Sequence, residues 1–258
     1  MATFLFDKII FGPVSSRRLG TSLGINLLPN DRKICTFNCI YCECGWTDTH
    51  SSSRSFHPRE EIRDSLRYKL ARMKENNEPL DTITFAGNGE PTMHPDFDLV
   101  IQDTLGIRNQ FFPKAKIAVL SNSTLIHKPK VFNALKRIDL NILKVDSAFE
   151  TTVKFLNQPY EGFDFQRTIE YLIRLNGKVI IQTMFIRGKY NGQHFDNTTP
   201  EEVNAWLQLL EKINPQQVMI YTIARDTPSE SIEKIPEEEL EEIAKRVEEK
   251  GFSTQISS

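Results

Sequence analysis

Three cysteines are spaced so that their thiolates could bind one metal centre. Cys35, Cys39 and Cys42 are separated by three and then two residues, in the segment after the first predicted strand. Soft sulfur ligands suit iron–sulfur clusters or zinc. Structural zinc is closed by four ligands, whereas three thiolates leave one iron of a cubane cluster open to a small molecule. The candidates for a fourth ligand are Cys44 and His50.

The spacing C-x3-C-x2-C, with the aromatic residue Tyr41 before the third cysteine, resembles the signature of the radical S-adenosylmethionine (SAM) superfamily. In that superfamily the triad binds a [4Fe-4S] cluster, and the amino and carboxylate groups of SAM chelate the open iron. The resemblance therefore implies that Cys35, Cys39 and Cys42 are the metal ligands and that Tyr41 lies at the cofactor site. It leaves Cys44 as a spare thiol beside the cluster.

A glycine-rich segment follows the predicted strand at 82–85 and contains Gly87, Asn88, Gly89 and Glu90. Glycines let a backbone approach a ligand closely, and an ammonium group needs oxygen acceptors. Taken alone, such a segment could be an ordinary turn between a strand and a helix. One strand after the cysteines, it resembles the G-G-E-P-like segment that binds the SAM amino group, which implies that all four residues bind the cofactor.

Polar, aromatic and apolar residues at the ends of the later predicted strands are further candidates. The resemblance implies that they contact the carboxylate, ribose or adenine of SAM. Each could instead be an ordinary polar strand end or a packed core side chain. These predicted cofactor-binding residues are Ser121, Asn122, Asp146, Gln182, Tyr221 and Ile223.

The candidate residues need a fold that brings strand ends together. Apolar, β-rich runs alternate along the chain with segments of helical spacing. The predicted strands cover 23–28, 82–85, 116–120, 140–145, 178–186 and 217–223. The predicted helices cover 58–74, 95–106, 129–137, 164–175, a segment that begins at Pro200, and 236–250.

This order, a strand followed by repeated helix–strand units, implies parallel strands with right-handed crossovers. Six strands are too few for the closed eight-stranded barrel. The predicted fold class is therefore α/β, with a partial (β/α)6 barrel of the radical SAM type, and a doubly wound sheet is the alternative. In both architectures the site forms at the C-terminal ends of the strands.

One radical SAM domain is predicted over residues 1–258, because no repeat, low-complexity tract or long linker divides the chain. It divides into an N-terminal leader (1–20), the barrel core (21–225) and a C-terminal helical extension (226–258). Clustered cysteines cannot staple so long a chain, and no apolar stretch fits a signal peptide or a membrane span. A cytoplasmic protein without membrane contact is expected, and the formal charge of -2 gives no global attraction to nucleic acid.

The N-terminal leader indicates a particular group within the radical SAM superfamily. Residues 11–20 and 22–26 resemble the radical SAM group related to wyosine synthetase, a tRNA-modifying enzyme. Arg17 and Arg18 could meet a phosphate or carboxylate of the substrate, or be solvated charges. The wyosine enzymes have further cysteines upstream of the triad for a second cluster, whereas residues 1–34 contain none and none follows the four clustered cysteines. The chain therefore has ligands for one cluster.

The resemblance implies that the reduced cluster passes one electron to SAM and cleaves it to methionine and a 5'-deoxyadenosyl radical, which abstracts hydrogen from a substrate. An electron donor such as flavodoxin or ferredoxin is then expected. The leader favours tRNA or nucleoside modification, which the absent second-cluster cysteines and the neutral charge oppose. Activation of a partner protein, a glycyl-radical enzyme, is the alternative reaction. A non-catalytic zinc-binding module built from Cys35, Cys39, Cys42 and Cys44 is the alternative of a different class.

Overall fold

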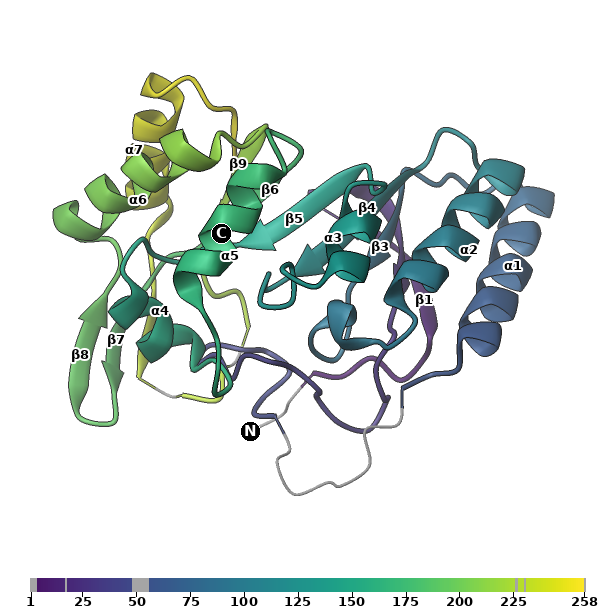
Figure 1. Ribbon diagram of the computed structural model, residues 1–258, viewed down its shortest axis with the longest axis horizontal. Coiled ribbons are helices and arrows are strands. Elements are labelled where there is room, and N and C mark those ends of the chain that lie inside the picture. The colour runs from purple at the N-terminus through teal and green to yellow at the C-terminus, as the bar shows by residue number, and fades with distance from the viewer. Residues whose placement is uncertain (1–3, 17, 48–55, 226, 230, 258) are drawn as a thin grey trace.

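A curved sheet covered by helices dominates the computed structural model of the chain (Figure 1). The described residues are 4–16, 18–47, 56–225, 227–229 and 231–257. Two residues singled out above, Arg17 and His50, lie outside them. No helix in the described part of the chain is both long enough and apolar enough to span a membrane.

The main sheet has eight strands. In spatial order they are β1 (Ile10–Ser16), β2 (Gly20–Ile25), β3 (Thr82–Phe85), β4 (Lys116–Ser121), β5 (Leu140–Lys144), β6 (Ile180–Met184), β9 (Gln217–Tyr221) and β11 (Thr254–Ser257). β1 runs antiparallel to β2, and every other neighbouring pair is parallel. The parallel strands from β2 to β9 form the predicted (β/α)6 half-barrel, which is confirmed, and their C-terminal ends lie along one edge.

Helices alternate with these strands and bury one apolar face each. They are α1 (Arg59–Glu75), the short 3-10 helix η1 (Pro91–Met93), α2 (Phe97–Phe111), α3 (Pro129–Leu135), α4 (Glu150–Asn157), α5 (Phe165–Arg174), α6 (Pro200–Ile213) and α7 (Glu237–Glu249). α6 begins where the sequence predicts, because the Thr199 side chain accepts a hydrogen bond from the N–H of Glu202 at 3.3 Å. The buried face of α1 consists of Ile62, Leu66, Leu70 and Met73, which recur at helical spacing.

The long strand predicted at 178–186 is interrupted. β6 ends at Met184, and β7 (Ile186–Tyr190) begins a small second sheet with β8 (Gln193–Asp196) and β10 (Ile232–Lys234). Asn197 holds both sides of the break: its Nδ2 donates to the Met184 carbonyl (2.8 Å), and its Oδ1 accepts from the N–H of Ile186 (2.8 Å). The interruption therefore depends on a residue that comes later in the chain.

Other elements also differ from the sequence-based expectation. The leader forms β1, and the C-terminal extension contributes β11 to the main sheet besides the predicted helix α7. β2 ends before the predicted 23–28 does, because the Asn26 side chain bonds the N–H (3.1 Å) and the carbonyl (2.9 Å) of Leu28 and turns the chain. Helix α4 was not predicted, since eight residues with two buried apolar side chains show little helical period.

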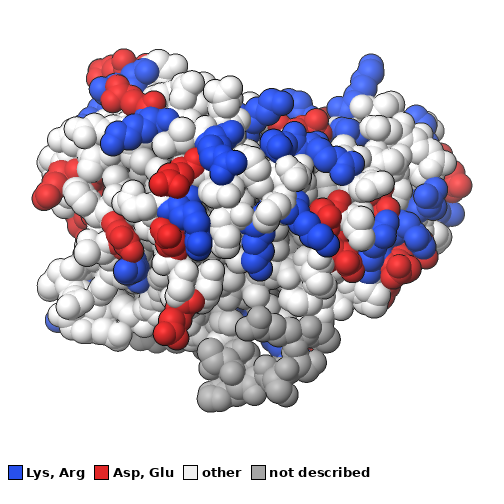
Figure 2. Space-filling view, viewed as in Figure 1, with Lys and Arg blue, Asp and Glu red and all other residues white. Residues whose placement is uncertain are grey.

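Charged side chains are mixed on the face that shows the helices. Figure 2 shows Lys and Arg interspersed with Asp and Glu over this face, in agreement with the formal net charge of -2. This face therefore offers no continuous basic stripe to a polyanion.

Candidate functional site

A cavity of about 610 Å³ opens where the parallel strands end, and all four cysteines line it. The cysteines belong to residues 34–47, here called the cysteine loop. Small-molecule sites in proteins are commonly about 300–1,000 Å³, so the cavity has the size of a cofactor site. A second hollow of about 640 Å³, beside β7, β8 and β10, is lined by no cysteine.

Backbone hydrogen bonds hold the cysteine loop between two parts of the fold. On one side the N–H of Ile34 donates to the Asn88 carbonyl (2.9 Å), and the N–H of Glu90 donates to the Ile34 carbonyl (3.0 Å). On the other side the N–H of Ile40 donates to the carbonyl of Leu156, near the end of α4 (3.0 Å). The loop is therefore anchored on both flanks, which fixes where its thiols lie.

Gly89 makes the first of these contacts possible. Its φ is +135°, a region that residues with a side chain rarely adopt, and a Cβ there would lie 1.8 Å from the Ile34 carbonyl oxygen. A Cβ on Gly87 would lie 2.3 Å from Asn26 Oδ1. Both positions therefore need glycine for the packing of the chain itself.

Asn88, between the two glycines, is fully buried and its side chain bonds the backbone. Its Nδ2 donates to the carbonyls of Phe6 (2.9 Å) and Pro29 (2.8 Å), and its Oδ1 accepts from the N–H of Phe6 (2.8 Å). It does not line the cavity. Asn88 thus ties the leader and the end of the β2 loop to the glycine turn.

The Glu90 carboxyl group lies in the cavity wall and accepts hydrogen bonds from two segments. Its Oε1 accepts from Ser121 Oγ (2.8 Å) and from the N–H of Thr92 (3.1 Å), and its Oε2 accepts from the N–H of Asn122 (2.7 Å). Burial raises the pKa of this carboxyl, since only 2% of the residue is exposed. Glu90 therefore fastens the end of β4 to the turn after β3.

Two asparagines approach the sulfurs of the triad. Asn122 Nδ2 lies 3.5 Å from Cys35 Sγ, and Asn157 Nδ2 lies 3.4 Å from Cys39 Sγ. Hydrogen bonds of this kind favour the thiolate and orient a metal ligand. The two amides come from opposite sides of the cavity, the end of β4 and the end of α4.

Cys42 has two polar neighbours, Lys33 and Cys44. The hydrogen bond from Cys44 and then the charge of Lys33 lower the pKa of the Cys42 thiol to about 5. Donating that hydrogen bond raises the pKa of Cys44. Burial raises the pKa of Cys35 to about 12 and also raises that of Cys39. The Cys44 thiol also donates to the Gly87 carbonyl (3.7 Å), and its role beside the triad stays a prediction.

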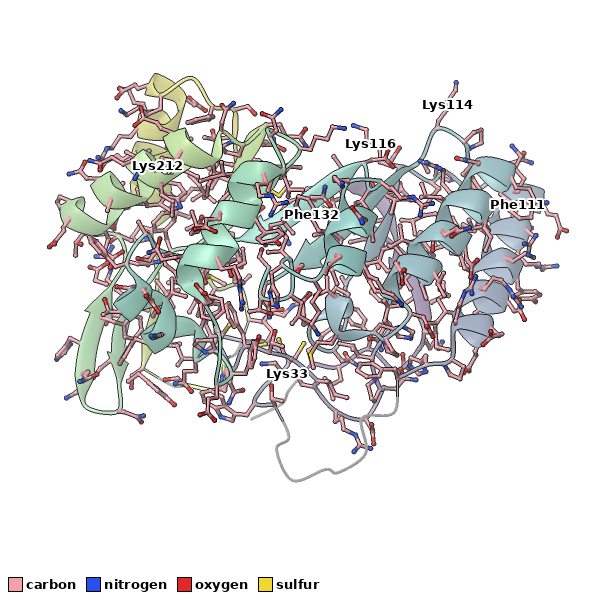
Figure 3. The ribbon with its side chains drawn as sticks, in the orientation of Figure 1. Lys33, Phe111, Lys114, Lys116, Phe132 and Lys212 are labelled. Carbon is pink, nitrogen blue, oxygen red and sulfur yellow. The ribbon has the colours of Figure 1, made fainter. Side chains whose placement is uncertain are left out.

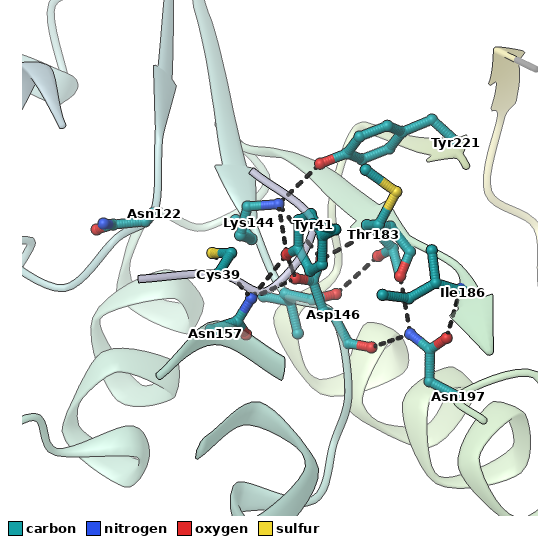
Figure 4. Close-up of polar contacts among 12 residues, drawn as sticks. Cys39, Tyr41, Asn122, Lys144, Asp146, Asn157, Thr183, Ile186, Asn197 and Tyr221 are labelled. Atoms are coloured by element: carbon teal, nitrogen blue, oxygen red, sulfur yellow. Dashed lines mark hydrogen bonds and ion pairs between the residues drawn. The ribbon is translucent and has the colours of Figure 1, made fainter. Parts of the chain in front are cut away.

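A buried polar network forms the opposite wall (Figure 4). The Lys144 ammonium group lies 2.7 Å from Tyr221 OH, 3.2 Å from Tyr41 OH and 3.5 Å from Asp146 Oδ1. Asp146 also accepts hydrogen bonds from Tyr41 OH and from Asn157 Nδ2 (2.7 Å). Burial alone would lower the pKa of Lys144, but the Asp146 carboxylate raises it. The network links β5 and β9 to the cysteine loop.

Most of the residues predicted from the sequence meet at this cavity. Asp146 lies behind Lys144 and Tyr41 rather than in the lining, and Ile223 packs with apolar residues around the cysteine loop. Besides the triad, the predicted residues that line the cavity are Tyr41, Gly87, Gly89, Glu90, Ser121, Asn122, Gln182 and Tyr221. The assignment of each side chain to cluster or SAM stays a prediction.

Three polar residues of the site were missed by the sequence analysis: Lys33, Lys144 and Asn157. Lys144 did leave a signal, because it is a charged residue inside the largely apolar run 140–145, which was predicted to be a strand. Lys33 and Asn157 left none, since polar residues in loops and at helix ends are usually solvated. Both are buried here, at 3% and 1% exposure.

The family comparison agrees with the site. The model of the Radical SAM superfamily matches residues 32–199, more than half of the chain. The chain is also 33% identical over 238 residues to UPF0026 protein MJ1312 of Methanocaldococcus jannaschii, covering 90% of this chain and 68% of that protein. The chain therefore belongs to the radical SAM superfamily and to the UPF0026 family, and the superfamily implies a [4Fe-4S] cluster and SAM.

A longer relative matches as well. The protein named GTPase Obg of Brachyspira hyodysenteriae is 32% identical over 249 residues, which are 95% of this chain but only 34% of that protein. The chain thus spans about a third of its length. The GTPase activity in that name refers to the longer protein.

Solved structures share the fold. The wyosine synthetase TYW1 with a lysine-pyruvate adduct bound has a TM-score of 0.62 at 15% identity, over 90% of this chain and 75% of that one. SuiB of Streptococcus suis bound to S-adenosylmethionine has a TM-score of 0.64 at 14% identity, over 91% and 50%. The resemblance to radical SAM proteins, with TYW1 among the structural neighbours, is confirmed.

Proposed function

We propose that the chain is an enzyme that holds a [4Fe-4S] cluster on Cys35, Cys39 and Cys42 and cleaves SAM reductively. The observation that carries this proposal is that the three thiols share one cavity with the polar ends of the parallel strands. When bound, the cluster supplies the electron that cleaves SAM to methionine and a 5'-deoxyadenosyl radical, which abstracts hydrogen from the substrate.

The placement of the cysteines fits a cluster better than a zinc ion. A Zn–S bond of about 2.3 Å puts four tetrahedral thiolates roughly 3.8 Å apart. Within the described residues, no three Cys, His, Asp or Glu side chains lie close enough together to hold one metal ion. A cubane takes one thiolate on each of three irons, and the three thiols of the triad share one cavity, which suits a cluster.

The remaining cavity residues would orient SAM. Backbone oxygens of the glycine turn offer acceptors to its amino group, and the Asn122 and Gln182 amides, both in the lining, can bond its carboxylate or ribose. The ring of Tyr221 gives an apolar surface for adenine. Phe37 is 4% exposed and helps to keep water from the thiols.

We also propose an anionic substrate, for which Arg18 is the supporting residue. Arg18 lines the cavity, and its guanidinium lies 5.6 Å from the ring centre of Tyr221. Its Nη1 is buried and has no hydrogen-bond partner in the described part of the chain. A phosphate or carboxylate would satisfy this group, and a nucleotide of tRNA has that chemistry.

Activation of a glycyl-radical enzyme is the second candidate. A domain of pyruvate-formate lyase-activating enzyme from Bacteroides vulgatus has a TM-score of 0.51 at 16% identity, over 69% of this chain and 99% of that one. A chain with one cluster is sufficient for such a reaction. In either reaction the electron would come from a donor such as flavodoxin or ferredoxin.

Anaerobic reconstitution with iron and sulfide tests the proposal. The wild type should take up a cluster with visible absorbance and, with dithionite, should release 5'-deoxyadenosine from SAM. Cys39→Ala should reduce both signals to background, because a cluster ligand is lost. Cys44→Ala is the matched control and should keep both. A wild type that binds zinc tightly, takes up no iron and leaves SAM intact would contradict the proposal.

The substrate class is tested by adding bulk tRNA or cell peptides to the reconstituted enzyme. Faster release of 5'-deoxyadenosine with tRNA supports nucleoside modification. A response to peptides alone points to the partner-protein alternative.

A further inference from the structure

Lys33 is a buried lysine without a carboxylate partner among the residues that the structure describes. It is 3% exposed, and its Nζ donates to the Gly45 carbonyl at 2.9 Å. No described Asp or Glu oxygen lies within 4.0 Å of its Nζ. Lys144, across the cavity, has Asp146 Oδ1 at 3.5 Å. A buried ammonium group is costly unless an opposite charge is near, so Lys33 needs another counter-charge.

The groups that face Lys33 are thiols. Lys33 lines the same cavity as Cys35, Cys39 and Cys42. Figure 3 places Lys33 at the edge of the sheet where sulfur atoms gather. Metal-bound thiolates at these positions would compensate its charge.

The two carboxyl groups that line the cavity have other partners. Glu43 pairs with Arg225 at 2.8 Å. Glu90 accepts its hydrogen bonds from Ser121 and Asn122, at the end of β4, and from Thr92 in η1. The thiolates are therefore the anions that the described residues offer to Lys33.

A bound cluster would be anionic, because three thiolates outweigh the charge of the oxidised cubane core. One-electron reduction, by a donor of the flavodoxin or ferredoxin class, adds a further negative charge. A fixed positive charge close to the sulfurs stabilises the reduced form more than the oxidised form. Net charge and hydrogen bonds to the sulfurs are known to set the potentials of such clusters.

We propose that Lys33 is the built-in counter-charge of the cluster, which stabilises the metal-bound thiolates and raises the reduction potential. The inference rests on the proposed function and adds to it a positioning residue whose charge acts on the thiolates of the triad. It explains why a lysine without a carboxylate partner is buried beside this triad and not elsewhere in the cavity.

The test is a reductive titration of the reconstituted protein without SAM, followed by electron paramagnetic resonance. Lys33→Met removes the charge and keeps the apolar stem. It should lower the equilibrium constant for one-electron reduction at least tenfold, which is about 59 mV. Lys33→Arg keeps the charge and should stay near the wild-type potential. Lys114→Met, at the opposite edge of the sheet (Figure 3), is the control for loss of a lysine and should have no effect.

A Lys33→Met cluster with the wild-type potential overturns the inference and leaves the proposed function intact. Failure of the wild type to take up a cluster overturns both. If Lys33→Met loses its iron, the iron content of Lys33→Arg separates the two explanations. Retention of iron in Lys33→Arg shows that iron binding needs a positive charge at this position, which supports the inference. Loss of iron in both variants assigns Lys33 a packing role and overturns the inference.

Discussion

The two walls of the cavity balance charge in different ways. One wall, here called the β5 wall, contains Lys144 and Asp146 at the end of β5. The Lys144 ammonium group lies 3.5 Å from Asp146 and forms hydrogen bonds with two tyrosines. On the cysteine-loop wall, Lys33 is more deeply buried than Lys144 and shares the cavity with the thiols. The β5 wall is therefore complete in the polypeptide itself, whereas the other wall becomes neutral only with deprotonated cysteines. The first wall is neutral without a ligand, and the second matches the cluster site proposed above.

The largest effect on stability is expected from breaking the β5 wall. Asp146→Asn leaves the Lys144 ammonium group buried without its counter-charge. Removing one partner of a buried ion pair typically costs about 3–5 kcal/mol, and we expect a loss near the lower end because Lys144 is partly exposed. Urea unfolding of the metal-free protein measures it.

Two controls show whether charge is the cause. Combining Asp146→Asn with Lys144→Met should recover part of the loss, because no unpaired charge remains. Glu150→Gln breaks the exposed Lys154–Glu150 pair at 2.8 Å and should cost no more than about 0.5 kcal/mol. Equal losses in the single and double variants would refute the ion-pair explanation.

A smaller effect is expected where the cysteine loop meets the glycine turn. Gly89→Ala places a Cβ 1.8 Å from the Ile34 carbonyl at a φ of +135°. Backbone strain of this kind costs about 1–3 kcal/mol, and the contact that holds the loop must shift. Thermal unfolding should show the loss, and reconstituted protein should hold less iron.

Gly106→Ala is the matched control for this substitution. Gly106 lies in α2, where an added Cβ meets nothing within 4 Å. Alanine favours a helix over glycine by about 0.5–1 kcal/mol, so this variant should be slightly more stable than the wild type. A Gly89→Ala protein as stable as Gly106→Ala would show that the loop contact is dispensable.

The smallest effect concerns pH. His94 Nδ1 accepts from the N–H of Asp96 (3.1 Å), so its Nε2 carries the proton and donates to the His57 carbonyl (2.9 Å). Burial lowers the pKa of His94, which means that the unfolded chain binds a proton more readily. Stability from this group is therefore present above the ordinary histidine pKa of about 6.5 and is lost as pH falls below it.

Urea unfolding at several pH values checks the histidine. His94→Gln should cost about 1 kcal/mol at neutral pH, the usual contribution of a hydrogen bond, and should flatten the decline in acid. The hydrogen-bond network around Lys144 and Asp146 contains no histidine. Acid should therefore first weaken the segment around His94, which follows β3 in the chain. Parallel pH profiles for wild type and variant would contradict this assignment.

Much of the fold could be predicted because its strands are apolar runs with local patterns. β3 lies at the predicted residues, and α1 and α6 begin within a residue of their predicted positions. β1 and β11 were missed, since each is a half-exposed edge strand whose pairing depends on a distant neighbour. The same reason explains the break at Met184, which Asn197 causes from a later loop.

The sequence by itself determined which chemistry is available: three thiols at C-x3-C-x2-C spacing, and a glycine turn with Glu90, because ligand type and close spacing are local properties. Only the tertiary structure decided how the buried charges are balanced. Lys144 and Asp146 reach Tyr41 across sequence separations of 103 and 105 residues, and Asn157 reaches Cys39 across 118. Such contacts arise where parallel strands bring their C-terminal ends together, and no local pattern records which side chain will meet which.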